Sequence, residues 1–108
     1  MTFEELLTFI TLEDQRLKDN FENYPDTGKR ALARAVKLSE ETGELCSEIL
    51  SFNSMQRQEK MESYSRDNLA HEFADVIITA LLLAKTTNID VKDALRKKIE
   101  KINARYKS

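Results

Sequence analysis

The chain has few of the residues that make tight turns: two glycines and one proline in 108 residues. Strands in a small domain need such turns, so their scarcity argues against a β fold and favours a few long helices. Hydrophobic residues make up 41% of the chain, enough for one small core. We therefore expect a single all-α domain over residues 1–108, to which self-association would add buried surface.

Three other features of the composition bear on the compartment and the partners of the protein: its cysteine content, its charge balance and its longest apolar run. The lone cysteine, Cys46, cannot close an internal disulfide, which is typical of a reducing compartment. Lysine and arginine total 17 against 19 acidic residues, so the basic excess of a protein that binds duplex nucleic acid is absent. The longest apolar run, 76–84, is too short to cross a bilayer, and the acidic start MTFEELLTFI is unlike a signal peptide. We expect a cytoplasmic protein with no membrane or duplex nucleic acid partner.

Hydrophobic periodicity and breakers predict four helices. Thr2 and Glu5 form a capping box at the start of the first helix, and Pro25 and Gly28 mark the break after it. The fourth helix should begin after an N-cap at Asn88 or Asp90. The polar stretch 53–65 predicts a connection with at most a helical turn or two. The expected helices are 2–20, 29–52, 67–87 and about 90–106, forming a four-helix bundle completed by homodimerisation.

The third of these helices is unusually apolar. Residues 73–84 read FADVIITALLLA, with only Asp75 and Thr79 polar. A helix that is apolar on all sides is normally buried on all sides. We expect it at the centre of the bundle or at the seam of a dimer.

Two acidic pairs lie at helical spacing on the second and third helices. Positions three apart are about 60° apart around a helix, so Glu41 and Glu44 project together, as do Glu72 and Asp75. If the two helices pack side by side, the four carboxylates converge. Such pairs are common in an acidic chain and usually form a solvated face. Asp75 differs because it interrupts an apolar helix, where an ionised carboxylate is costly unless a cation compensates it; the ordinary alternative is a salt bridge at the helix rim.

The candidate ligands are all oxygens, which suit Mg²⁺ and, secondarily, Mn²⁺. Zinc is disfavoured because Cys46 and His71 have no partners at ligand spacing, and His71 is best interpreted as a surface or packing residue.

The last helix carries a positive face. From residue 90 to 108, seven cations stand against three acids, and Lys98, Lys101 and Arg105 share one side at spacings i, i+3 and i+7. The ordinary interpretation is a solvated face balanced by acidic neighbours. The alternative is a wall that binds phosphates held from the other side by the metal.

The segments KLSEETGEL (37–45) and HEFADVIITALLLAKTTNIDV (71–91) resemble the MazG-like nucleotide pyrophosphohydrolases, the all-α NTP pyrophosphatases. The family signature, Glu-Glu-x-x-Glu followed by Glu-x-x-Asp, is matched here by Glu40, Glu41, Glu44, Glu72 and Asp75, and the resemblance covers roughly residues 30–106. The resemblance implies metal ligation by Glu41, Glu44, Glu72 and Asp75, with Glu40 as a supporting or water-orienting group. It further implies phosphate contacts by Lys37, Lys98 and Arg105.

The function that the resemblance implies is Mg²⁺-dependent hydrolysis of a nucleoside triphosphate to monophosphate and pyrophosphate by a dimer or dimer of dimers. Phosphoribosyl-ATP pyrophosphohydrolase and the dimeric dUTPases, branches of the same superfamily, stay open as alternatives. So does a non-catalytic helical dimerisation module. Aromatic residues near the first helix, Phe9, Phe21 and Tyr24, could stack on a base or belong to the core, and the base and sugar preference is not predicted.

Overall fold

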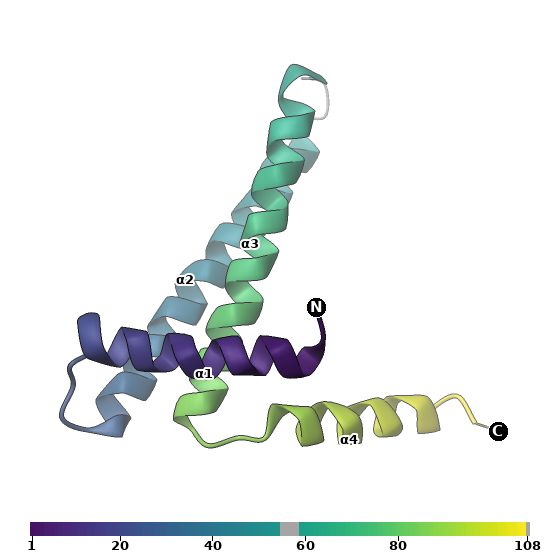
Figure 1. Cartoon of the computed structure of the whole chain (residues 1–108). Helices are drawn as coiled ribbons and strands as arrows, with labels where there is room; N and C mark the ends of the chain where they lie inside the picture. The colour runs from purple at the N-terminus through teal and green to yellow at the C-terminus, as the bar shows by residue number, and fades with distance from the viewer. Residues whose placement is uncertain (55–58, 108) are drawn as a thin grey trace.

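The computed structural model describes residues 1–54 and 59–107, and these form four helices with no strand among them (Figure 1). The helices are α1 (Phe3–Asn20), α2 (Thr27–Ser54), α3 (Glu59–Thr86) and α4 (Val91–Ala104). The predicted all-α class is confirmed. No helix in the described ranges is both long and apolar enough to cross a membrane.

Local signals set the starts of α1 and α4 where the sequence places them. Thr2 and Glu5 form the predicted capping box, with 3.1 Å hydrogen bonds in both directions. Asp90, rather than Asn88, caps α4 by accepting a 3.1 Å bond from the backbone N–H of Asp93. Asn88 instead takes a left-handed conformation with φ of 58°, which asparagine tolerates better than most residues.

The predicted connection at 53–65 was wrong for most of its described residues. α2 continues through Ser54 and α3 already begins at Glu59, while residues 55–58 lie outside the described part. The segment EKME (59–62) consists of good helix formers, so a helix persists there although the segment has little apolar character. α2 and α3 therefore form a long antiparallel hairpin (Figure 1).

The core lies where α1 crosses the base of this hairpin. Ile10 of α1 packs with Leu81 and Leu82 of α3, and these three are buried. The partly buried apolar residues around them are Leu6, Leu17, Ile78 and Val91. α3 thus packs against both α1 and α2, as its apolar sequence predicts, but Phe73 and Ile77 stay about half exposed in the single chain.

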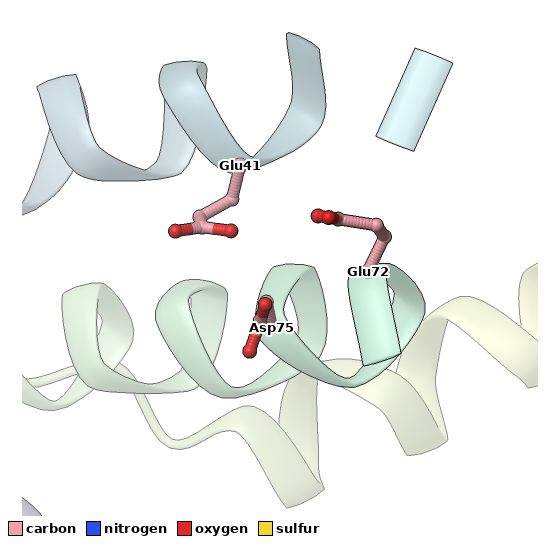
Figure 2. A group of neighbouring side chains, drawn as sticks. All are labelled: Glu41, Glu72 and Asp75. Carbon is pink, nitrogen blue, oxygen red and sulfur yellow. The ribbon is translucent and has the colours of Figure 1, made fainter. Parts of the chain in front are cut away.

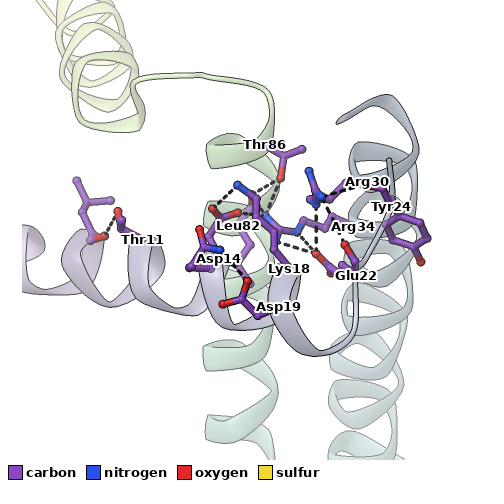
Figure 3. A network of polar contacts seen from close by, with 12 residues as sticks. Thr11, Asp14, Lys18, Asp19, Glu22, Tyr24, Arg30, Arg34, Leu82 and Thr86 are labelled. Carbon is purple, nitrogen blue, oxygen red and sulfur yellow. Dashed lines mark hydrogen bonds and ion pairs between the residues drawn. The ribbon is translucent and has the colours of Figure 1, made fainter. Parts of the chain in front are cut away.

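A buried arginine joins the three helices at the same level. Arg34 of α2 is only 2% exposed and donates to Asp14 of α1 at 2.6 Å and to the Thr86 hydroxyl of α3 at 2.7 Å (Figure 3). It also pairs with Glu22 at 2.8 Å and donates to the Leu82 carbonyl at 3.1 Å. A buried cation requires such partners, and here they fix α1 across the hairpin.

α4 extends away from the base of the hairpin (Figure 1). Its first residue, Val91, reaches the core, but Leu95 and Ile99 are about half exposed. The radius of gyration is 17.2 Å, against about 13 Å for a compact domain of this length. A single chain therefore leaves much apolar helix surface uncovered.

Candidate metal and phosphate site

Three carboxylates meet between α2 and α3, about midway along the hairpin. Glu41 comes from α2, and Glu72 and Asp75 come from successive turns of α3 (Figure 2). One carboxylate oxygen from each lies within 4.8 Å of the other two. The i, i+3 spacing predicted that Glu72 and Asp75 project together, and the antiparallel packing of α2 on α3 places Glu41 opposite them.

Glu44 adjoins the group without being one of the three. Its charge is among those that act on Glu72. The pKa of Glu72 is raised by burial first, and then by the nearby negative charges of Glu44, Asp75 and Glu41. The four acids that the sequence singled out therefore share one region of the α2–α3 seam.

The carboxylate that is buried is not the one expected. Burial was expected for Asp75, which interrupts an apolar helix, yet Asp75 is exposed and Glu41 is only 7% exposed. α1 crosses the hairpin nearer to Leu81 and Leu82, so it leaves the level of Asp75 open. The salt bridge considered as an alternative for Asp75 is also not found among the described residues.

Two oxygens in the group have unmet bonding capacity. Oε2 of Glu41 and Oε2 of Glu72 are buried and have no hydrogen-bond partner among the described residues. Buried polar atoms are normally paired, and several close carboxylates repel one another. A divalent cation that prefers oxygen ligands would satisfy both oxygens and relieve the repulsion. The residues present thus fit a Mg²⁺ or Mn²⁺ ion.

Lys37 and Glu40 stand at the edge of the group. Nζ of Lys37 lies 3.1 Å from Oε1 of Glu41, and that contact raises the pKa of the lysine, with smaller contributions from Glu40 and Glu44. Glu40 is exposed and lies outside the group of three. Lys37 therefore contacts the carboxylates directly, whereas Glu40 contributes only the electrostatic effect of its charge on Lys37.

The basic residues of α4 are not brought to the carboxylates within one chain. Lys98, Lys101 and Arg105 are exposed, and none forms an ion pair within the ranges 1–54 and 59–107. α4 leads away from the hairpin (Figure 1). Whether they bind phosphates stays a prediction.

The seam holds two polar contacts that the sequence did not single out as part of a site. Nδ2 of Asn68 donates to Oε1 of Glu48 at 2.9 Å, linking α3 to α2. Glu48 follows Glu44 by one turn and Asn68 precedes Glu72 by one turn, so i, i+4 spacing would have revealed both. Thr79, also buried, donates to the backbone carbonyl of Asp75 at 2.6 Å.

The remaining candidates are at the surface. His71 is exposed, in agreement with its interpretation as an ordinary surface residue, and Cys46 is a free, exposed cysteine. The aromatic residues considered for the core or the base are exposed as well: Phe9 and Tyr24 at 38% and Phe21 at 80%. The core interpretation of these three is therefore wrong for the single chain.

The family model for the MazG nucleotide pyrophosphohydrolase domain matches residues 30–108. The chain belongs to the MazG family. The matched range contains the four carboxylates of the α2–α3 seam, Lys37 and the basic residues of α4, and it omits all of α1. No match was found among curated proteins or among solved structures. The family is one of hydrolases that act on the phosphoric anhydrides of nucleotides, typically with a divalent metal.

Proposed function

We propose that this MazG protein is a Mg²⁺-dependent nucleoside triphosphate pyrophosphohydrolase, which cleaves (d)NTP to (d)NMP and pyrophosphate. The observation that carries the proposal is the pair of buried, unpartnered oxygens of Glu41 and Glu72 beside Asp75. Without a bound cation such a cluster is destabilising, because each ionised carboxylate makes ionisation of its neighbours less favourable.

The proposed metal ligands are Glu41, Glu44, Glu72 and Asp75. Mg²⁺ bound there would neutralise charge on the triphosphate and increase the acidity of a water molecule. Glu44 is included because the family motif contains it and its charge acts on Glu72. Mn²⁺ offers the same preference for oxygen and is the expected substitute.

Water must attack the α-phosphorus in line with the departing pyrophosphate. Glu40 follows the motif of the family and is proposed to orient or deprotonate that water from the edge of the cluster. No side chain has to become a covalent nucleophile in this scheme. The exposed position of Asp75 leaves the cluster accessible to a large, charged substrate.

The phosphates need positive side chains as well as the metal. Lys37 is already at the cluster, 3.1 Å from Glu41. Lys98, Lys101 and Arg105 are proposed to bind the leaving phosphates, where fixed cations stabilise developing charge. Since α4 extends away within its own chain, we propose that they act in a homodimer or dimer of dimers, in which α4 is repositioned or serves the partner's carboxylates.

Two other functions use the same features. Phosphoribosyl-ATP pyrophosphohydrolase and dUTPase activities would need the same carboxylates and the same α–β cleavage, and differ only in the nucleotide. A non-catalytic helical module would use the exposed apolar faces but leaves the buried oxygens of Glu41 and Glu72 unexplained.

The deciding experiment is pyrophosphate release from a panel of dNTPs, NTPs and phosphoribosyl-ATP, with Mg²⁺ and with EDTA. The expected result is Mg²⁺-dependent release of monophosphate and pyrophosphate from one or more triphosphates. Turnover of dUTP or phosphoribosyl-ATP alone would select the corresponding alternative. Absence of turnover, together with no heat of binding for Mg²⁺ and a nonhydrolysable dNTP, would favour the module.

A further inference from the structure

A second polar pocket lies at the base of the hairpin, separate from the carboxylates. Its volume is about 200 Å³, and it is bounded by the ends of three helices. α1 contributes Asp14 and Lys18, the start of α2 contributes Thr27 and Arg30, and the end of α3 with its loop contributes Lys85, Thr86 and Asn88. Lys85 follows Asp75 by ten residues, so about 15 Å of helix separates the pocket from the carboxylate cluster.

The charge at this pocket is positive. Three of its seven residues are cations and only Asp14 is an acid. That acid is already neutralised, because Asp14 pairs with Arg34 at 2.6 Å and with Lys18 at 2.9 Å (Figure 3). Lys85 is exposed and has no acidic partner within the ranges 1–54 and 59–107.

The guanidinium of Arg30 has incompletely satisfied hydrogen-bond donors. Its side chain is 13% exposed, and its buried Nε has no hydrogen-bond partner in the described part of the chain, since Oε1 of Glu22 is 4.0 Å away. Nη2 of Arg30 reaches the carbonyls of Glu22 and Tyr24 only at 3.4 and 3.3 Å. A buried guanidinium with weak or missing acceptors is unusual in a protein interior.

The backbone adds to the positive field. α2 begins at Thr27, so the positive end of the dipole of a 28-residue helix lies at the rim of the pocket. Asp26 uses one carboxylate oxygen to cap this end through the N–H of Lys29 at 2.8 Å. With Glu22 and Asp26 counted, the groups at the pocket and beside it are four cations (Lys18, Arg30, Arg34 and Lys85) and three acids.

We propose that this pocket, lined by Lys18, Arg30 and Lys85, binds a small phosphate-type dianion as a second site distinct from the metal cluster. A tetrahedral oxyanion has enough acceptors to use Lys85, Arg30 and the first turn of α2 together. The pocket joins all three core helices, so an anion bound there would stabilise the attachment of α1 to the hairpin.

Amide NMR with EDTA present tests the site without the metal cluster. Inorganic phosphate and a nucleoside monophosphate are titrated separately, because the dianion could arrive free or on a nucleotide. The expected result is a saturable shift of the Thr27, Gly28 and Asn88 amides in at least one titration, with Glu72 and Asp75 unmoved. Lys85→Ala should weaken that binding about tenfold, the loss expected for one charged hydrogen bond.

Lys107→Ala is the matched control, because it removes the same charge from an exposed position far along the chain. It should leave the phosphate titration unchanged. Lys85 is exposed, so its truncation should leave the amide spectrum of the folded protein intact. The proposal is overturned if neither anion gives a saturable shift at these amides, or if Lys85→Ala and Lys107→Ala weaken binding equally.

Discussion

Nζ of Lys37 lies 3.1 Å from Oε1 of Glu41, one turn further along α2. The lysine is a proposed phosphate contact and the glutamate a proposed metal ligand, so one ion pair connects both halves of the site. Oε2 of Glu41 remains buried and accepts no hydrogen bond from residues 1–54 or 59–107. The lysine thus neutralises only part of the charge of Glu41, and the remaining oxygen is available to a cation.

Replacing Lys37 by methionine should weaken substrate binding more than it affects turnover. Loss of a charged hydrogen bond to phosphate corresponds to a rise in KM of about tenfold or more. Stability should fall as well, by about 1–3 kcal/mol, because the lysine side chain is 59% exposed but the buried carboxylate of Glu41 loses its cationic partner. Steady-state kinetics and thermal unfolding measure the two effects. Lys107→Met is the charge-matched control, and a KM equal to wild type would exclude Lys37 from phosphate binding.

Amide substitutions at the cluster should abolish Mg²⁺-dependent pyrophosphate release. Glu41→Gln and Asp75→Asn keep the side-chain size but remove a charged ligand, so activity should fall by roughly 100-fold or more. The fold should persist, because neither side chain is needed by the core around Ile10. Pyrophosphate assays and circular dichroism test these two statements.

Glu100→Gln serves as the control for the amide substitutions, since Glu100 pairs with Arg96 on the exposed face of α4. It should retain full turnover. Wild-type turnover in Glu41→Gln or Asp75→Asn would remove that residue from the site.

The raised pKa of Glu72 predicts how the metal-free protein responds to pH. Burial and the charges of Glu44, Asp75 and Glu41 raise this pKa in the folded state, so the folded protein binds the proton more tightly than the unfolded chain. The resulting stabilisation is complete below pH 4.5 and is lost as pH rises through the folded pKa. Glu72→Gln should therefore raise the Tm of the metal-free protein at pH 7, as measured in EDTA.

Magnesium should reverse the difference in stability between wild type and Glu72→Gln. Wild type should gain Tm on addition of Mg²⁺ at pH 7, by an amount that grows with metal concentration, and should gain less as acidification protonates Glu72. Glu72→Gln should gain little at any pH. An equal Mg²⁺-induced gain in both proteins would show that Glu72 is not a ligand.

The cluster could be predicted from the sequence because helix geometry fixes the direction of side chains three residues apart. Glu72 and Asp75 project together for that reason, as do Glu41 and Glu44, and side-by-side packing of the two helices brings the pairs together. The buried arginine could not be predicted in the same way. Arg34 meets Asp14 and Thr86 across separations of 20 and 52 residues, and no local pattern marks such pairs. The length of the hairpin was also missed, because its distal turns have little apolar periodicity to follow.

The exposed apolar face of α3 predicts self-association. Phe73 and Ile77 are 48% and 51% exposed, one turn apart, although the sequence around them is almost wholly apolar. Burial of this apolar patch against a second copy would be favourable, because apolar surface gains free energy when it is removed from water. Ile77→Glu should shift the protein from dimer or tetramer to monomer in sedimentation velocity. Thr11→Glu, at an exposed position of α1, is the control. A wild-type protein that sediments as a monomer would contradict the prediction.

Arg34 should be the most sensitive position for stability. Arg34→Met leaves Asp14 buried, next to Glu22, without its main partner, and breaking one side of a buried pair typically costs about 3–5 kcal/mol. The Tm should fall by more than about 10 °C. Arg16→Met, which removes an exposed pair with Glu13 at 3.5 Å, should change it little.

Acid unfolding provides an independent test of the same network. Burial alone would raise the pKa of Asp14, but the hydrogen bonds and charges of Arg34 and Lys18 outweigh it and hold that pKa below 3.8. Asp14 therefore contributes stability that is present above pH 3.8 and is lost as pH falls through the lower folded value. In Arg34→Met this contribution should largely vanish, so the Tm of the variant should approach that of wild type as the pH falls toward 2. A constant difference in Tm between pH 7 and pH 2 would mean that Arg34 stabilises the fold through packing rather than through Asp14.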